Sequence, residues 1–420
     1  MKILWFSLSP CGSMRRNKTT KFTQTWMVTL EDELKKDPEI ELSVAYFSNK
    51  DEETFQYDNV TYYPMSVASH SYKDKFRNIW GNVDSLNNFK LALMKKVLAI
   101  CSPDLIHIHG TESCFGLITP HVGNIPVVYS LQGVMSSISE KYFAGYERKE
   151  ASETDTFKDC LFAKTAKRTF RNFLKSSELE RSFLSKANYI IGRTDLDRSI
   201  SMLINPKRKY YVVNEIMRRD FMETAWQPHS DKTFKIISVL SAGIYKGYPT
   251  LLKAASLLTH YSEFEFEWNV IGCDINDKWI KAAIHKTGVH PEDVHINLLG
   301  KQTAQFIVEK ELDSSLYIHT GQTENSPNTV CEAMCLGMPI IATFAGGTSS
   351  ILEHKKEGYL VQDGDAFALA GAIVEAHKHY NQYVDWGKTA RQHAIARHSA
   401  ANVVEELTSA YKAILNEHNF

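Results

Sequence analysis

The sequence predicts an α/β protein with two doubly wound domains of similar size. The chain has 420 residues, which allows two or three domains at about 150 residues each. Short runs of β-branched and aromatic residues alternate with longer amphipathic stretches, and this alternation fills the first half and repeats in the second. Such alternation is typical of parallel sheets flanked by helices, whose ligands bind at the carboxyl ends of the strands.

The expected strands follow these runs in order. In the first half they are Lys2–Ser9, Glu41–Ser48, Leu105–Gly110, Val127–Gly133, Tyr189–Thr194 and Tyr210–Asn214. In the second half they are Phe234–Ser241, Phe266–Gly272, Val294–Gly300, Leu316–Gly321, Pro339–Phe344 and Tyr359–Val361. Helical patterns lie between the strands. A last helix at residues 400–419 is predicted by the spacing of Val403, Val404, Leu407, Tyr411 and Leu415.

A polar, non-periodic stretch at residues 215–232 separates the two halves. It predicts one domain at residues 1–215 and a second at residues 216–399. We expect the two sheets to face each other across a cleft.

The composition limits the range of functions. There are 48 Lys and Arg residues against 49 Asp and Glu, and without a long basic run we expect no nucleic-acid partner. The seven cysteines show no CxxC or Cys/His zinc spacing, which predicts reduced thiols, a cytoplasmic location and no metal site. Cys331 and Cys335 lie in an apolar run and are expected to pack in the core. No run approaches the ~18 apolar residues of a membrane span.

Residues 160–186 form a basic amphipathic helical pattern that leaves two interpretations open. The helix contacts an anionic membrane surface or a lipid-linked acceptor, or it packs on its own domain with a solvated basic face. Several aromatic residues of the first half could likewise stack on sugars or belong to the core: Trp26, Trp80, Tyr142, Phe143 and Tyr146.

The segment from His319 to Gly337, HTGQTENSPNTVCEAMCLG, is the most informative for function. We expect a strand to end at Thr320 or Gly321 and a helix to begin near Pro327 or Asn328. The free amides of Asn328, Thr329 and Val330 would then lie at the positive end of the helix dipole, an arrangement that binds phosphate.

Two carboxylates flank these amides. Glu324 precedes them and Glu332 follows on the first or second helical turn. A carboxylate can accept hydrogen bonds from two neighbouring hydroxyls, which is how a ribose is often held next to a pyrophosphate. The segment therefore predicts a site that binds sugar hydroxyls, a diphosphate and a ribose in a row.

The pattern Glu324-x7-Glu332, in the setting ENSPNTVCEAMCLGMPIIAT, resembles the donor-site motif of retaining glycosyltransferases of the GT-B fold, family 4. Residues 241–247, SAGIYKG, resemble the Lys-Gly element of this family, and residues 103–110, PDLIHIHG, resemble its PDxxHxH strand. The resemblance covers nearly the whole chain. It implies a GT-B fold whose carboxyl-terminal helix, residues 400–420, returns to the amino-terminal domain.

The resemblance also implies roles for single residues. Glu332 would hold the ribose of the donor, and Glu324 and His109 would contact the transferred sugar. Lys246, together with Gly243 in the same loop, would meet the diphosphate, as would the backbone amides that begin the helix. Gly12 matches a glycine of the first loop, whose amide approaches the diphosphate and the acceptor. His107 lies deeper on the same face as His109 and is expected to be structural.

The chain departs from the family pattern at two positions. Cys11 replaces a glycine usually paired with Gly12, and Ser241 stands where an arginine is common. Either Arg218 or Arg193 replaces that arginine, or Lys246 and backbone amides hold the phosphates alone. Asp195-Leu196-Asp197 follows a strand and opens a helix, so we interpret Asp195 as an N-cap and not as a metal ligand.

The resemblance predicts a retaining transferase that moves a sugar from a nucleotide-diphosphate sugar to a hydroxyl of a saccharide or lipid-linked saccharide. The process would be polysaccharide or glycoconjugate biosynthesis, without a metal or other cofactor for the chemistry. Two alternatives stay open. One is a nucleotide-sugar-binding subunit without catalysis, and the other is an epimerase or phosphorylase of the same fold. The expected location is cytoplasmic, with peripheral contact to the inner face of the membrane as an open question.

Overall fold

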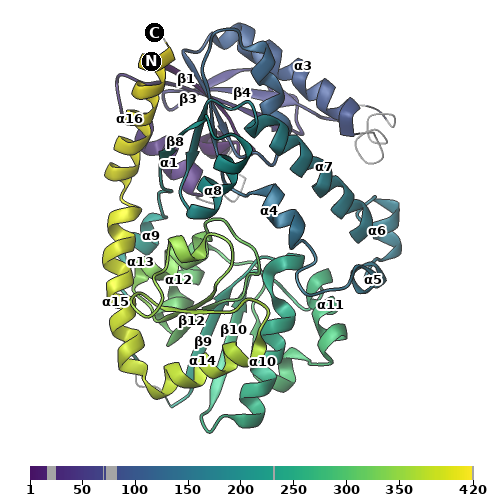
Figure 1. Ribbon diagram of the computed structural model, residues 1–420, viewed down its shortest axis with the longest axis vertical. Helices are drawn as coiled ribbons and strands as arrows, with labels where there is room; N and C mark the ends of the chain where they lie inside the picture. The colour runs from purple at the N-terminus through teal and green to yellow at the C-terminus, as the bar shows by residue number, and fades with distance from the viewer. Residues whose placement is uncertain (17–24, 70, 72–82, 230–231, 419–420) are drawn as a thin grey trace. The chain divides into compact units, whose positions relative to one another are not determined.

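The computed structural model describes residues 1–16, 25–69, 71, 83–229 and 232–418 (Figure 1). The chain divides into two compact units. The first contains Met1–Ser139, Phe157–Ile216 and Ser399–Phe420, and the second contains Glu140–Thr156 and Met217–His398. The chain therefore passes from one unit to the other at four places. Each unit is built on one largely or wholly parallel sheet with helices, which confirms the α/β, doubly wound class.

The sheet of the first unit has the strand order β3-β4-β2-β1-β5-β6-β7-β8. Every neighbouring pair is parallel except β3 and β4. The strands are β1 (Lys2–Phe6), β2 (Glu41–Ser48), β3 (Phe55–Tyr57), β4 (Val60–Ser66), β5 (Leu105–His109), β6 (Val127–Ser130), β7 (Tyr189–Gly192) and β8 (Lys209–Val212). The described helices are α1 (Trp26–Leu34), α3 (Val83–Cys101), α4 (Met135–Glu140), α6 (Phe157–Leu161), α7 (Ala166–Leu184), α8 (Asp195–Ile204) and α16 (Ala400–His418), with 3₁₀ turns η1 (Cys11–Arg16) and η2 (Cys114–His121).

The sheet of the second unit is fully parallel, in the order β11-β10-β9-β12-β13-β14. Its strands are β9 (Phe234–Val239), β10 (Phe266–Ile271), β11 (Ile296–Leu298), β12 (Leu316–His319), β13 (Ile340–Thr343) and β14 (Tyr359–Val361). Its described helices are α5 (Arg148–Glu153), α9 (Arg219–Glu223), α10 (Tyr248–Tyr261), α11 (Lys278–Thr287), α12 (Ala304–Leu312), α13 (Asn328–Leu336), α14 (Ala366–Lys378) and α15 (Tyr380–Arg397), with 3₁₀ turns η3 (Ile244–Lys246), η4 (Pro291–Val294) and η5 (Thr348–Ser350).

Each expected strand is present, although most are shorter than expected, and the hairpin of β3 and β4 is an addition. The hairpin turns at Asp58 and Asn59, whose φ values of 53° and 63° fit the two-residue turns that join antiparallel strands. The sequence signal is weak because β3 has three residues and β4 contains Pro64, which removes a backbone donor.

The carboxyl-terminal helix α16 packs into the first unit, as the resemblance implies. Its Val403, Leu407, Tyr411 and Ile414 are buried in one cluster with residues of β1 and β2. The Trp5 indole N–H donates to the Tyr411 hydroxyl at 3.0 Å, across 406 residues of chain. The apolar spacing therefore predicted the helix correctly.

Residues 140–156, which we call the strap, belong to the second unit, although the sequence places them in the amino-terminal domain. Lys141 pairs with Asp363 at 2.9 Å, and Lys286 of α11 pairs with Glu150 at 2.7 Å. Tyr146 is 6% exposed and its ring lies 6.0 Å from that of Trp279. These contacts connect residues more than 100 positions apart, so the local pattern carried no sign of them.

The structure also locates the two core cysteines and the N-cap of α8. Cys331 and Cys335 are fully buried, which confirms their place in the core. The N-cap of α8 is Thr194 and not Asp195, because the Thr194 side chain accepts the Asp197 amide and Asp197 completes a capping box. Trp80 lies outside the described residues. Among the described helices, none is long and apolar enough to cross a membrane.

Candidate functional site

Two loops follow neighbouring strands of the second unit and are joined by hydrogen bonds. β9 and β12 lie side by side and end at Val239 and His319. The Gln322 amide donates to the Tyr245 carbonyl at 2.9 Å, and the Thr320 hydroxyl donates to the Lys246 carbonyl at 2.8 Å. The backbones come so close at Gly247, φ 77°, that a Cβ there would lie 2.0 Å from the Thr320 carbonyl oxygen.

This junction brings Lys246 and Glu324 together. The Lys246 ammonium donates to Glu324 Oε1, and the two side chains are 17% and 15% exposed. Both predicted residues therefore lie at one point, at the carboxyl ends of two adjacent strands, where ligands of open α/β sheets bind.

His319 is a neighbour of this pair to which the sequence analysis gave no role. Its Nε2 lies 3.7 Å from Glu324 Oε1, and the residue is 2% exposed. Burial lowers the pKa of His319 to about 4; the positive charge of Lys246 adds to this effect and Glu324 opposes it. The imidazole is therefore uncharged at neutral pH, and Lys246 is the cation beside Glu324. Its position at the end of β12, five residues before Glu324, is the sequence signal that could have identified it.

Two glycines allow the Glu324 loop to fold tightly. Gly346 has φ 56°, and a Cβ there would lie 1.8 Å from the Glu324 carbonyl oxygen. The neighbouring Gly347 amide donates to this same oxygen at 2.9 Å. The loop after β13 thus holds the backbone of Glu324 in place through a contact with its carbonyl oxygen.

Helix α13 begins at Asn328, as expected, but only part of its first turn is available. The Val330 amide donates to the Pro327 carbonyl at 2.9 Å, so the prediction that it is free is wrong. At a helix start the first amides, here those of Asn328 and Thr329, have no carbonyl within the helix to which they can donate. These two amides and the helix dipole make the start of α13 attractive for an anion.

Glu332 is buried and paired. It is 5% exposed, and Arg218 Nε and Nη2 donate to its two carboxylate oxygens at 2.6 and 2.7 Å. Burial raises the pKa of Glu332, and the charge and hydrogen bonds of Arg218 oppose that shift. Arg218 is therefore engaged by Glu332. The other candidate replacement for the missing arginine, Arg193, donates to the buried Glu215 at 3.0 Å in the first unit.

Gly243 and Ser241 shape the turn before Lys246. The Gly243 amide donates to the Ser241 carbonyl at 2.8 Å, and the Gly243 carbonyl accepts the Lys246 amide at 3.2 Å. Gly243 thus shapes the loop of Lys246, while its own amide is used within the loop.

The first unit carries His109 at the end of β5. Its ring stacks on that of His107 at 3.7 Å, and it is 2% exposed. Within the described part of the chain, neither ring nitrogen of His109 has a hydrogen-bond partner. His107 lies 2.6 Å from both the Tyr411 hydroxyl and the Ser130 hydroxyl, which fits a structural role. Burial lowers the pKa of His109 well below its ordinary value.

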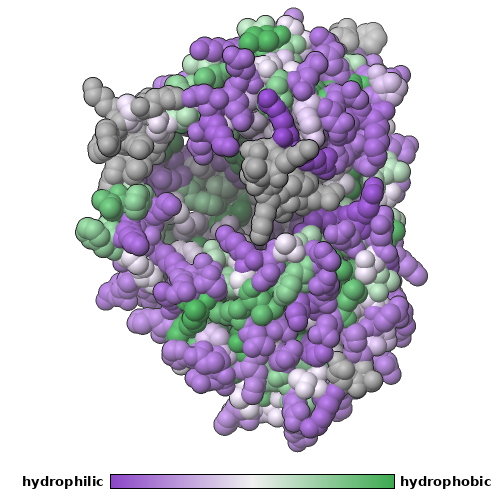
Figure 2. All heavy atoms as spheres, turned by 180° about the vertical axis from the view of Figure 1, so that it is seen from behind, coloured by the Kyte–Doolittle hydropathy of each residue, from purple (hydrophilic) through white to green (hydrophobic). Residues whose placement is uncertain are grey.

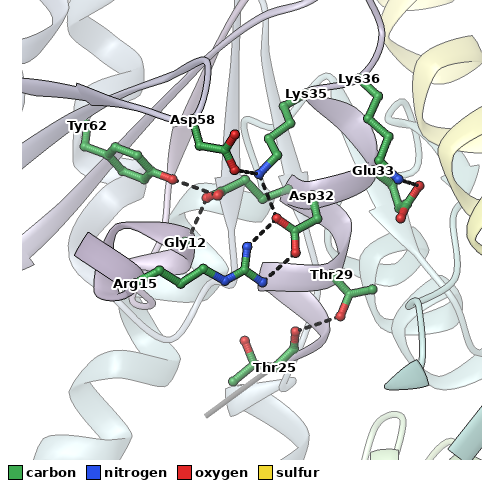
Figure 3. Close-up of polar contacts among 11 residues, drawn as sticks. Gly12, Arg15, Thr25, Thr29, Asp32, Glu33, Lys35, Lys36, Asp58 and Tyr62 are labelled. Atoms are coloured by element: carbon green, nitrogen blue, oxygen red, sulfur yellow. Dashed lines mark hydrogen bonds and ion pairs between the residues drawn. The ribbon is translucent and has the colours of Figure 1, made fainter. Parts of the chain in front are cut away.

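Gly12 lies in a polar network of the first unit (Figure 3). Its amide donates to Glu31 Oε2 at 3.1 Å, and Tyr62 donates to Glu31 Oε1 at 2.7 Å. Arg15 holds the next carboxylate, Asp32, with two bonds of 2.6 Å. A Cβ at position 12 would lie 2.1 Å from Glu31 Oε1. The Gly12 amide is therefore engaged by a carboxylate, which differs from the expectation that it approaches a diphosphate.

Residues 222–393 match the family described as Glycosyl transferases group 1. The poly(ribitol-phosphate) alpha-N-acetylglucosaminyltransferase of Staphylococcus aureus is 22% identical over 370 residues, 86% of this chain and 69% of that protein. The N-acetyl-alpha-D-glucosaminyl L-malate synthase of Bacillus anthracis is 26% identical over 129 residues, 31% of this chain and 33% of that protein. The chain thus spans about a third of the length of the first curated relatives that it matches.

A solved structure extends the likeness to both units. HepE of Anabaena, in complex with UDP and glucose, has a TM-score of 0.65 with 15% sequence identity, and the alignment covers 98% of this chain and 99% of that chain. At this identity the likeness shows the fold alone. The expected GT-B fold is confirmed.

Proposed function

Because residues 222–393 of this chain belong to the glycosyl transferases group 1 family, we propose that the protein is a retaining glycosyltransferase. It moves a sugar from a nucleotide-diphosphate sugar to a hydroxyl group of a saccharide acceptor, in polysaccharide or glycoconjugate biosynthesis. The observation that carries the proposal is the meeting of Lys246 and Glu324 beside the start of α13. The solved relative that holds UDP and glucose supports the donor class.

The chemistry of these groups matches the charge that develops during transfer. The leaving diphosphate gains negative charge, and a fixed cation with helix-terminal amides stabilises it. Lys246 supplies the cation, and Asn328 and Thr329 supply the amides. Glu324 accepts hydroxyls of the transferred sugar, and Glu332 accepts those of the ribose. His109 is proposed to contact the transferred sugar.

The acceptor is proposed to be a saccharide or a lipid-linked saccharide, reached by peripheral contact with an anionic membrane. Helices α6 and α7 support this contact. Phe157 and Leu161 of α6, Phe162 just after it and Leu174 of α7 are 83%, 54%, 50% and 38% exposed. Figure 2 shows green apolar side chains at the left edge, where the turned view brings α6, next to purple hydrophilic ones. Apolar side chains beside Lys and Arg are typical of helices that lie in a membrane interface.

Turnover tests the proposal directly. The purified protein is incubated with a panel of UDP-, GDP- and ADP-sugars, and release of nucleoside diphosphate is measured. Lys246→Ala should lower turnover by a factor equivalent to about 3 kcal/mol, as for the loss of one oxyanion donor. Lys253→Ala is the matched control, because Lys253 is an exposed lysine on the adjacent helix α10. Equal turnover in the two variants would refute the role of Lys246.

Two further measurements test the finer parts. The anomeric configuration of the product, read by NMR, must equal that of the donor, and inversion would reject the retaining mechanism. Turnover must persist with EDTA, since no metal is proposed for the chemistry. Nucleotide binding without turnover on any acceptor would instead favour the non-catalytic subunit.

A further inference from the structure

Three helices of the second unit bring three ionisable side chains together. Arg218 precedes α9, Glu311 lies on α12 and Glu332 lies on α13, and α9 contacts both of the other helices. The two bonds of 2.6 and 2.7 Å from Arg218 to Glu332 form a fork on a carboxylate. Such a contact fixes the plane of both groups and is stronger than a neutral hydrogen bond.

The surroundings of Arg218 hold its guanidinium in place. Its carbonyl accepts the amides of Phe221 and Met222 at 3.1 and 3.3 Å, which anchors its backbone to α9. The ring of Phe221, which is fully buried, lies 4.5 Å from the guanidinium carbon. Arg391 of α15 donates to the Thr224 carbonyl at 2.7 Å and ties the end of α9 to the unit. The guanidinium that contacts Glu332 is therefore held by contacts with α9 and, through Arg391, with α15.

Glu311 is the second buried carboxyl group of this cluster. It is 1% exposed, and among the described residues no hydrogen-bond partner meets its Oε2. Burial, followed by the negative charge of Glu332, raises the pKa of Glu311 well above its ordinary value, while Arg218 opposes the shift. Burial therefore favours the protonated form of Glu311 more than it would be favoured in an exposed glutamate. An ionised Glu311 would attract the same guanidinium and weaken its hold on Glu332.

We propose that Arg218, through its two hydrogen bonds to the carboxylate oxygens, positions Glu332 for the ribose of the donor. An ionised carboxylate offers about four acceptor positions, of which the fork uses two. The remaining two accept the 2′ and 3′ hydroxyls. The inference rests on the proposed function, because only a nucleotide donor brings a ribose to Glu332. Arg218 is a positioning residue, since it touches Glu332 and not the donor.

The experiment compares nucleotides that differ only in the ribose hydroxyls. Binding of UDP, GDP and ADP to the full chain is measured by calorimetry, and the tightest of them is then compared with its 2′,3′-dideoxy form. We expect the wild-type protein to prefer the ribonucleotide by at least about tenfold, since hydrogen bonds to a charged acceptor are lost in the dideoxy form. In R218Q this preference should fall below about threefold.

Two variants separate positioning from general damage. R219Q is the matched control, because Arg219 is the next residue, its side chain is 70% exposed and its partner Glu223 lies on the same short helix. It should keep the wild-type preference. R218K keeps the charge and the fold but cannot hold two oxygens with one ammonium, so its preference should lie between those of R218Q and the wild-type protein. In an E332Q background, R218Q should cause no further loss.

The outcomes distinguish failure of the proposed function from failure of the role proposed for Arg218. A wild-type protein that binds none of the three nucleotides overturns both the proposed function and this inference. A wild-type protein that prefers the ribonucleotide, together with R218Q and R218K proteins that keep the full preference, overturns only the role of Arg218. Equal loss of preference in R218Q and R219Q would also overturn it.

Discussion

Acidification should weaken the second unit through His319. The imidazole has an ordinary pKa of 6.5 in the unfolded chain and a pKa of about 4 in the folded protein, because burial disfavours the charged ring. A base whose folded pKa is lowered contributes stability above its unfolded pKa, and this stability is lost as the pH falls through the folded value. The difference of about 2.5 pKa units corresponds to about 3.4 kcal/mol in all, of which about 1.8 kcal/mol is lost between pH 7 and pH 5.

The assay is urea unfolding of the wild-type protein and of His319→Gln, followed by far-UV circular dichroism at pH 7, 6 and 5. Glutamine stays uncharged over this range, while the other titrating groups are common to both proteins. The free energy of unfolding of the wild-type protein relative to the variant should therefore fall by about 1.8 kcal/mol from pH 7 to pH 5. A difference that does not change with pH would refute the assignment of a buried, uncharged His319.

Three other substitutions test the network around the site. Gly346→Ala should destabilise the second unit by about 1–3 kcal/mol or more in urea unfolding, since alanine is strained at φ 56° and its Cβ would lie 1.8 Å from the Glu324 carbonyl oxygen; Gly371→Ala, with open space around it, is the control. Glu311→Gln should gain stability relative to the wild-type protein as the pH rises above the ordinary glutamate pKa, because a group whose folded pKa is raised contributes stability that is lost as the pH rises through the folded value; a difference that does not change with pH would contradict a buried Glu311 with a raised pKa. Tyr411→Phe should cost about 1–3 kcal/mol in thermal unfolding by leaving Trp5 and His107 without their buried partner, whereas Tyr261→Phe, at 72% exposure, should be silent.

The sequence predicts the elements of this fold well, because their signals are local. Consecutive apolar residues predict a strand such as β12, and the apolar spacing predicts the helix α16. Glu324 and Glu332 were found because strand ends and helix starts mark where ligands bind in such folds. Lys246 was found through the resemblance of residues 241–247 to the Lys-Gly element of the family. The hairpin at β3 and β4 was missed because its strands are short and one of them contains a proline.

The partners of the site residues could not be predicted. Lys246 and Glu324 are 78 residues apart, and Arg218 and Glu332 are 114 residues apart. Such pairings depend on which strands become neighbours in the sheet, and no local sequence pattern predicts that strand order. The same reason explains Gly12, whose amide meets Glu31 of the following helix, and Val330, whose amide turns back to Pro327.

The four passages of the chain between the units have a consequence for synthesis on the ribosome. The strap emerges early but finds its partners, such as Lys286, only after more than 100 further residues. The first unit begins with β1 yet remains open until Tyr411 has emerged to meet Trp5. The second unit ends at His398, before Tyr411 emerges, so the first unit is completed after the second, although amino-terminal domains generally fold first. The nascent chain must therefore keep the unfinished core of the first unit from aggregating while the second unit is being made.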